Sequence, residues 1–276
     1  MAAHAVDTPA GGYPPERHVL RDLRLWSERG ESGTRTGLEL VPGLLGPTGE
    51  VRLGVLATLA DVAAGELAVR SARPGWVATS DLVLHRLRGP RSARLEARPA
   101  LVRRTRSTIV LEVTLADGAA DALGLATMTF AVLPAREGQR HMGVGHDTPR
   151  TDFALPGSGL DGPLVERIGA RCLDAAAGRF ELALEPYVGN SLGALQGGVV
   201  ALLVDLAAEA AGGAALGSPC IARDMALNYL ALAREGPVRT GATVLRADAA
   251  AALVRAEVCD GAGGRTALAT VAVVRV

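Results

Sequence analysis

Two apolar stretches decide the fold of this chain. Residues 53–64 read LGVLATLADVAA, and residues 197–208 read GGVVALLVDLAA. Each stretch carries one aspartate at the same place, Asp61 in the first and Asp205 in the second, 144 positions apart. An internal repeat indicates a duplicated structural unit. Because an acid inside an apolar helix is costly to bury, each aspartate needs a partner or a function.

The sequence around the two stretches repeats one order of elements. A strand-like run and a Gly-rich loop come first, and the apolar stretch then predicts a helix that is apolar nearly all round and therefore buried. Alternating and β-branched residues predict about four strands after each helix. These are residues 76–84, 92–103, 107–115 and 123–133, and then 220–230, 236–246, 252–259 and 266–276. In this part the repeat continues, but matching residues are 143 instead of 144 positions apart, a one-residue slip that matches Asp81 with Asp224.

This order of elements predicts an α+β fold of two similar units. In each unit an antiparallel sheet is expected to wrap around one long central helix. Joining the two sheets edge to edge covers strand edges and makes the chain an intramolecular pseudo-dimer. We expect a ragged or disordered tail at 1–17, an N-terminal unit at 18–134, a linker at 135–162 and a C-terminal unit at 163–276.

The composition limits the class of function. Lys and Arg number 29, as do Asp and Glu, so the net charge is zero and no basic face for nucleic acid is expected. The three cysteines lack metal spacing, which predicts reduced thiols in the cytoplasm. His141 and His146 lack ligand partners at suitable spacing, so no metal is expected. Both apolar stretches look too short and too rich in Gly and Ala for membrane spans.

One motif in the second repeat resembles a known family. Residues 190–198 read NSLGALQGG and are followed by Asp205, a pattern similar to that of PaaI-like hotdog-fold thioesterases. Residues 224–230, DMALNYL, resemble the strand that follows the helix in that family. Two departures are Gln196, where the family usually has His, and the first repeat, which lacks the Asn and the Gly pair. The resemblance implies a double hotdog chain, with sites between its two units and pairing of two chains into a homodimer.

The resemblance implies one complete catalytic site, called site A here. It combines Asn190, Gln196 and Gly197 from the second repeat with Asp61 and Thr79 from the first. The Gly197 N–H at a helix N-terminus would stabilise the oxyanion. Asp61 would act as general base or as nucleophile, with Thr79 orienting the attacking water. Asn190 and Gln196 would hold water or the thioester oxygen. Structural alternatives are a turn residue at Asn190 and a helix-start polar residue at Gln196.

Further substrate contacts are expected around site A. Gly198 and Thr58 are predicted on the substrate side, although a Gly pair also serves close helix packing. Arg103 and Arg104 can meet phosphates of coenzyme A, with a solvated strand end as the alternative.

The opposite combination, the helix start of the first repeat with the acid of the second, gives a second site that lacks most of the expected groups, called site B here. It holds Asp205, Arg52, Gly54 and Arg223, with arginines expected to neutralise the acid. We therefore expect a single working site, at site A.

The predicted activity is hydrolysis of an acyl-CoA or acyl-carrier-protein thioester, with coenzyme A as part of the substrate and no other cofactor. The alternative is a non-catalytic acyl-thioester binding protein. A hotdog hydratase or dehydratase ranks below both, because Glu66 and Ala210 stand where that chemistry usually has His. With only 3% aromatic residues in the chain, the lining of the site is expected to be apolar and poor in aromatic rings, which favours an aliphatic acyl group.

Overall fold

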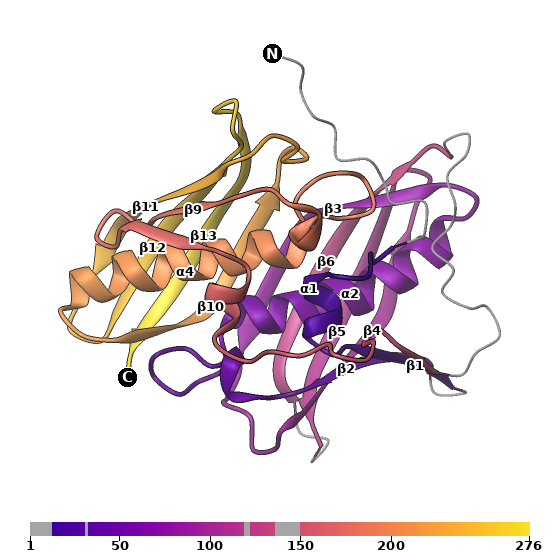
Figure 1. The fold of residues 1–276 in the computed structure, drawn as a ribbon, viewed down its shortest axis with the longest axis horizontal. Helices are drawn as coiled ribbons and strands as arrows, with labels where there is room; N and C mark the ends of the chain where they lie inside the picture. Colours follow the sequence, from indigo (N-terminus) through magenta and orange to yellow (C-terminus); the bar gives the residue numbers. More distant parts are fainter. Residues whose placement is uncertain (1–12, 31–32, 119–121, 136–149) are drawn as a thin grey trace.

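The chain folds into two similar units, each with one long helix against a curved antiparallel sheet (Figure 1). A computed structural model describes residues 13–30, 33–118, 122–135 and 150–276. The N-terminal unit contains α1 (Val19–Asp22), β1 (Trp26–Gly30), β2 (Gly33–Glu39), α2 (Leu53–Ala72), β3 (Trp76–Arg86), β4 (Arg94–Arg104), β5 (Thr108–Asp117), β6 (Ala122–Leu133) and β7 (Arg150–Asp152). The C-terminal unit contains α3 (Leu164–Arg167), β8 (Arg171–Asp174), β9 (Arg179–Leu182), α4 (Gly197–Leu216), β10 (Cys220–Tyr229), β11 (Val238–Ala247), β12 (Ala251–Cys259) and β13 (Arg265–Arg275).

The two half-sheets are continuous. The described strands follow the order β7-β1-β2-β4-β5-β6-β3-β10-β13-β12-β11-β9-β8 in one 13-stranded sheet. The units join where β3 pairs antiparallel with β10, with Leu82 opposite Leu227. The predicted α+β fold, its two central helices and the edge-to-edge junction are confirmed, and each of the eight strands predicted after the helices is found.

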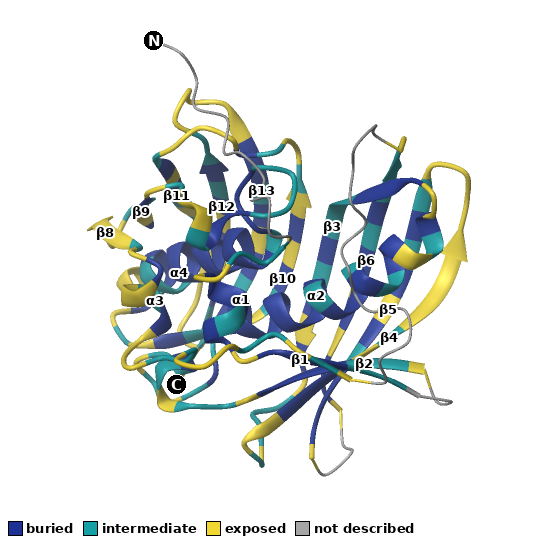
Figure 2. Ribbon diagram, turned by 45° about the vertical axis from the view of Figure 1, so that its right-hand side comes forward, coloured by how far each residue is buried: buried dark blue, intermediate teal, exposed yellow. Residues whose placement is uncertain are grey.

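Both long helices are buried because they are apolar nearly all round (Figure 2). α4 is capped at its C-terminus by Gly217, whose left-handed conformation, φ 64°, suits glycine. By length and composition α4 is the one helix of the described residues that matches a membrane span, so the expectation that it is too short is wrong. Of its most apolar window, however, 72% is buried inside the protein, which makes α4 a core helix.

The two long helices touch at pseudo-symmetric glycines. A Cβ on Gly54 would lie 2.4 Å from the Cα of Leu202, and a Cβ on Gly198 would lie 2.7 Å from the Cα of Thr58. Only glycine lets the two backbones approach this closely. Gly198 and Thr58, predicted on the substrate side, therefore serve this helix contact and are absent from the lining of the cavity described below.

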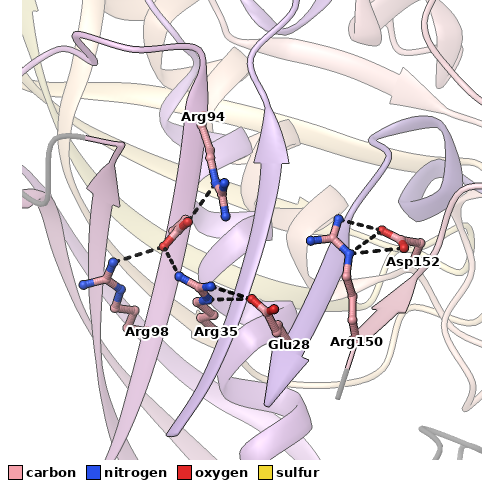
Figure 3. Close-up of polar contacts among 7 residues, drawn as sticks. Glu28, Arg35, Arg94, Arg98, Arg150 and Asp152 are labelled. Atoms are coloured by element: carbon pink, nitrogen blue, oxygen red, sulfur yellow. Dashed lines mark hydrogen bonds and ion pairs between the residues drawn. The ribbon is translucent and has the colours of Figure 1, made fainter. Parts of the chain in front are cut away.

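The structure corrects the predicted boundaries of the tail and the linker. Arg21 of α1 donates hydrogen bonds to the carbonyls of Pro14 and Pro15, so this part of the predicted tail is held against the N-terminal unit. In the predicted linker, β7 pairs with β1 at one edge of the sheet. Arg150 bonds Asp152 there, beside a second group of ion pairs on β1, β2 and β4 (Figure 3). Residues 1–12 and 136–149, with His141 and His146, lie outside the described residues.

Candidate active site

Asp61 lies near the middle of α2 and is held by both units. The Thr79 hydroxyl on β3 donates to Oδ1 of Asp61 at 3.0 Å. The Gln196 amide, at the N-cap of α4, donates to Oδ2 at 3.2 Å. The structure therefore brings together the acid and two partners predicted from sequence, across the interface between the units.

Gln196 has a fixed orientation. Its Oε1 accepts a hydrogen bond from the Val199 N–H at 3.0 Å, which caps α4. Because the oxygen serves the cap, the NH₂ group faces Asp61. Gln196 is therefore the helix-start residue of the structural alternative and also contacts the acid, while its predicted bond to water or to the thioester oxygen stays a prediction.

Gly197 allows the first turn of α4 to approach the acid. A Cβ at this position would lie 2.9 Å from Oδ2 of Asp61, so a larger residue would collide with the carboxylate. Within the described chain the Gly197 N–H has no hydrogen-bond acceptor, as expected for the first residue of a helix. This N–H and the positive end of the helix dipole are available to a negatively charged oxygen.

The environment of Asp61 changes its acidity. Its side chain is buried, and burial raises the pKa of Asp61 to about 6, opposed by the hydrogen bonds from Thr79 and Gln196. A carboxylate with this pKa is largely deprotonated at neutral pH and more basic than a surface aspartate. The site thus holds a base suited to proton transfer near neutrality.

Thr79→Ala tests the hydroxyl. Removing a hydrogen bond to the charged carboxylate should raise the pKa of Asp61 by about one to two units, since such a bond is worth roughly 1.5–3 kcal/mol. The acid limb of the kcat/KM profile should move to higher pH, while Thr79→Ser should keep it in place. An unmoved limb in Thr79→Ala would contradict the role given to the hydroxyl.

A cavity of about 450 Å³ opens beside Asp61. It runs between α2 and β3 and reaches the loop before α4. Most of its lining is apolar, and its polar lining includes residues of site A, namely Asp61, Thr79, Asn190 and Gln196. Gly65 on α2 lines this space, and a Cβ added there would meet nothing within 4 Å. The site therefore combines a base, a helix N-terminus and room for an apolar group.

The lining is rich in aromatic rings, which the sequence did not indicate. Five of the eight Phe, Trp and Tyr residues of the chain line this cavity: Tyr13, Trp76, Phe130, Phe153 and Tyr229. The expectation of an aromatic-poor lining is therefore wrong, because composition averages over the chain whereas the fold gathers these rings from five segments. The inference of an aliphatic acyl group loses its basis.

Asn190 lines the cavity but is engaged with its own loop. Its Oδ1 accepts from the N–H groups of Leu192 and Ala194 at 2.8 and 3.1 Å, and its Nδ2 donates to the Leu195 carbonyl at 3.2 Å. These bonds match the turn-residue alternative. Asn190 fixes the loop that leads into α4, and its predicted contact with substrate stays a prediction.

Tyr229 was missed as a site residue. Its hydroxyl donates to the Gly197 carbonyl at 2.9 Å, and burial followed by the charge of Asp61 raises its pKa. The tyrosine therefore stays neutral while it braces the first turn of α4. The motif at 224–230 contained this residue, but only the spatial contact gives it a role.

Site B is filled by charged side chains. The Gly54 N–H donates to Oδ2 of the fully buried Asp205 at 3.0 Å, whereas Oδ1 has no hydrogen-bond partner among the described residues. Arg52, at the position of Gln196, pairs with Glu209 at 2.8 Å. Glu209 occupies the position of Gly65. One repeat thus has open space where the other has an ion pair.

Arg223 does not neutralise Asp205. Its side chain is exposed, and the arginines whose charges act on Asp205 are Arg52 and Arg86. Thr79 directly precedes a bulge in β3, and Ala222 directly precedes the matching bulge in β10. The one-residue slip therefore makes Ala222 the counterpart of Thr79. Because alanine has no hydroxyl, it cannot donate to Oδ1 of Asp205.

Arg103 and Arg104 lie outside the cavity. Both are exposed at the end of β4, without an ion pair in the described chain. Arg104 on β4 pairs with Ile109 on β5. Ile109 pairs in turn with Phe130 on β6, and Phe130 pairs with Thr79 on β3. Three strand spacings separate Arg104 from Thr79, about 14 Å. The arginines therefore occupy the same end of the sheet as site A, and their contact with substrate stays a prediction.

The described chain matches one family model and several solved structures. Residues 192–267 match the family described as Thioesterase superfamily. The TesB protein of Mycobacterium avium subspecies paratuberculosis is 16% identical with a TM-score of 0.61, over 93% of this chain and 97% of that chain. A Thermobifida fusca protein provisionally assigned as a thioesterase II is 17% identical with a TM-score of 0.64, over 94% and 99%. A hot dog fold protein of Alicyclobacillus acidocaldarius is 16% identical with a TM-score of 0.60, over 94% and 98%.

A search of curated proteins finds no match to this chain. The structural likeness extends over nearly the whole chain, whereas the family match lies within the C-terminal unit. The double hotdog fold expected from residues 190–205 is confirmed by these structures, and residues 192–267 of the C-terminal unit match the thioesterase superfamily model.

Proposed function

We propose that this protein hydrolyses an acyl thioester at site A. The observation that carries the proposal is the geometry at Asp61, which Thr79 and Gln196 hold beside the free N–H of Gly197. An apolar cavity adjoins these groups. A base, an oxyanion donor and an acyl-sized space are the three elements that thioester hydrolysis requires.

The proposed mechanism is general-base hydrolysis. Asp61 takes a proton from a water while the water oxygen bonds to the thioester carbonyl carbon. The carbonyl oxygen becomes an oxyanion, which the Gly197 N–H stabilises. When the tetrahedral intermediate collapses, the C–S bond breaks and the thiolate leaves. The products are a carboxylic acid, which loses its proton to solvent and becomes a carboxylate, and a free thiol, which forms when the thiolate takes a proton from Asp61 or from solvent.

Asp61 as nucleophile is the other route. It would form an acyl anhydride that water then cleaves. We favour the general base, because Thr79 and Gln196 each engage one of the carboxylate oxygens. A single turnover in H₂¹⁸O tests the nucleophile route. The base route places the label in the product acid, whereas an anhydride that water opens at the carboxyl carbon of Asp61 places the label in Asp61 and leaves the first product acid unlabelled. Unlabelled product would overturn the general-base proposal.

The carrier of the acyl group, the assembly and the location are part of the same proposal. Arg103 and Arg104 are proposed to contact coenzyme A phosphates, which their position at the same end of the sheet supports. A homodimer of double-hotdog chains and a cytoplasmic location remain proposals. The hydratase alternative is weakened because Glu66, five residues after Asp61, forms an ion pair with Arg29 at 2.7 Å.

Thiol release tests the proposed function. We expect the purified protein to release free thiol from at least one member of a panel of acyl-CoAs that varies in length, branching and aromatic content. A thiol reagent measures the rate. If the protein binds acyl-CoA by calorimetry but releases no thiol, the non-catalytic binding protein is the correct reading, and an enoyl or hydroxyacyl product would indicate a hydratase.

A further inference from the structure

Two cavity-lining aromatic rings come from segments outside the regions predicted as the two units. Tyr13 belongs to the segment before α1, and Phe153 directly follows β7. Both line the same cavity as Asp61, and both are partly buried. Burial, then the charge of Asp61, raises the pKa of Tyr13, so its hydroxyl stays neutral close to the acid. Two residues outside the predicted units therefore complete the wall of the cavity.

Arg21 ties the two segments together. Its Nε donates to the Pro15 carbonyl at 2.6 Å, and its Nη2 donates to the Pro14 carbonyl at 2.6 Å. Its Nη1 donates to the carbonyl of Phe153 at 2.7 Å. A planar guanidinium holds three acceptors in a fixed arrangement, which the point charge of a lysine does not reproduce. Arg21 itself is not part of the cavity lining.

His18 fixes the other side of Tyr13. The two rings meet edge to face with centroids 5.1 Å apart. Burial lowers the pKa of His18 to about 4, so the ring is neutral at physiological pH. Its Nδ1 accepts from the Leu20 N–H, which leaves Nε2 to donate to the Gly189 carbonyl at 2.7 Å. The segment that carries Tyr13 therefore bridges from the N-terminal unit to the loop before α4.

We propose that Tyr13 and Phe153 set the size of the acyl group that site A accepts, and that Arg21 is the positioning residue that holds both rings. The inference rests on the proposed function, because it concerns the acyl cavity of that site. Two rings anchored by backbone contacts form a firm wall, and removing either ring enlarges the cavity. One methylene more or less in an apolar pocket changes kcat/KM by about 10- to 200-fold. The change in acyl preference should therefore be easy to measure.

The experiment compares kcat/KM for a bulky acyl-CoA with kcat/KM for acetyl-CoA. Tyr13→Ala and Phe153→Ala should each raise this ratio by about tenfold. Tyr13→Phe should keep the ratio of the unmodified protein, because the ring and not the hydroxyl forms the wall. Arg21→Ala should raise the ratio as the two alanine variants do, and Arg21→Lys should restore it only in part. Arg17→Ala, an exposed arginine of the same segment, is the matched control and should change nothing.

A second measurement keeps the inference separate from the proposed function. S-alkyl thioethers of coenzyme A cannot be hydrolysed, and their dissociation constants report the same size preference without turnover. If the unmodified protein releases no thiol but Tyr13→Ala tightens the bulky thioether relative to the small one, the activity fails and the inference stands. Unchanged ratios in Tyr13→Ala and Phe153→Ala, with melting temperatures equal to that of the unmodified protein, would overturn the inference.

Discussion

Asp61→Asn should lower kcat/KM for thioester hydrolysis by roughly 10²–10⁴-fold, the contribution typical of a positioned general base. Asparagine keeps the size of the side chain but cannot take a proton from water. It can still accept from Thr79 or Gln196, so binding of a non-hydrolysable thioether should change little. Single-turnover kinetics on the preferred acyl-CoA, with the thioether dissociation constant measured in parallel, separates chemistry from binding.

Asp205→Asn is the matched control for this substitution. Asp205 occupies the same position in the second repeat and is buried, yet it accepts from Gly54 in a site that charged side chains fill. We expect the activity per folded molecule to stay within about twofold of the unmodified protein. Equal loss in both variants would show that site B works too or that both substitutions act through the fold.

The pH profile should carry the signature of the same carboxyl group. Because the active form of a base is deprotonated, kcat/KM should rise with pH, be half-maximal at about 6, where the pKa of Asp61 lies, and level off above that pH. An unperturbed aspartate would give its acid limb near pH 4. The folded state also binds the proton of Asp61 more tightly than the unfolded chain does. The contribution of Asp61 to stability should therefore decrease as the pH rises from about 4 to about 6.

Gly65→Leu should remove activity toward large acyl groups while leaving the fold intact. A Cβ at this position meets open space, and the side chain beyond it would extend into the cavity beside α2. Leucine also favours a helix more than glycine does, by about 0.8 kcal/mol, so the melting temperature should not fall. We expect kcat/KM for a decanoyl thioester to fall at least about tenfold relative to that for an acetyl thioester.

Gly65→Ala is the control for helix propensity, because it adds a single methyl group and should leave most of the cavity free. The second repeat supports the reasoning, since Glu209 fills the corresponding place and pairs with Arg52. Unchanged decanoyl turnover in Gly65→Leu would place the acyl group elsewhere.

The sequence predicted those parts of the fold and site that depend on local pattern. The repeat offset placed Asp61 and Gln196 on matching helices, and the hydrogen bond between them spans the predicted interface. The same offset put Arg223 beside Asp205, which is wrong because the bulge in β10 makes Ala222 the counterpart of Thr79. The match of Asp81 with Asp224 contains the same shift, because both that pair and the pair Thr79 and Ala222 are 143 positions apart.

The aromatic wall of the cavity could not be predicted from the sequence, for another reason. Tyr13 and Phe153 lie in segments without periodicity, so no local pattern indicates where they pack. Their places depend on irregular contacts, such as those of Arg21 with Pro14, seven residues away, and with Phe153, 132 residues away. A single sequence gives no signal for such contacts.

Fusing the two half-sheets has a consequence for aggregation. Two separate sheets would expose four outer strands, each with unpaired backbone groups that can recruit another chain. The described sheet has only two such ends, β7 and β8, which span 3 and 4 residues. Both carry arginine and aspartate, as in Arg150 and Asp152, and short charged edges pair poorly with foreign strands. The junction of β3 with β10 thus also protects the protein against edge-to-edge association.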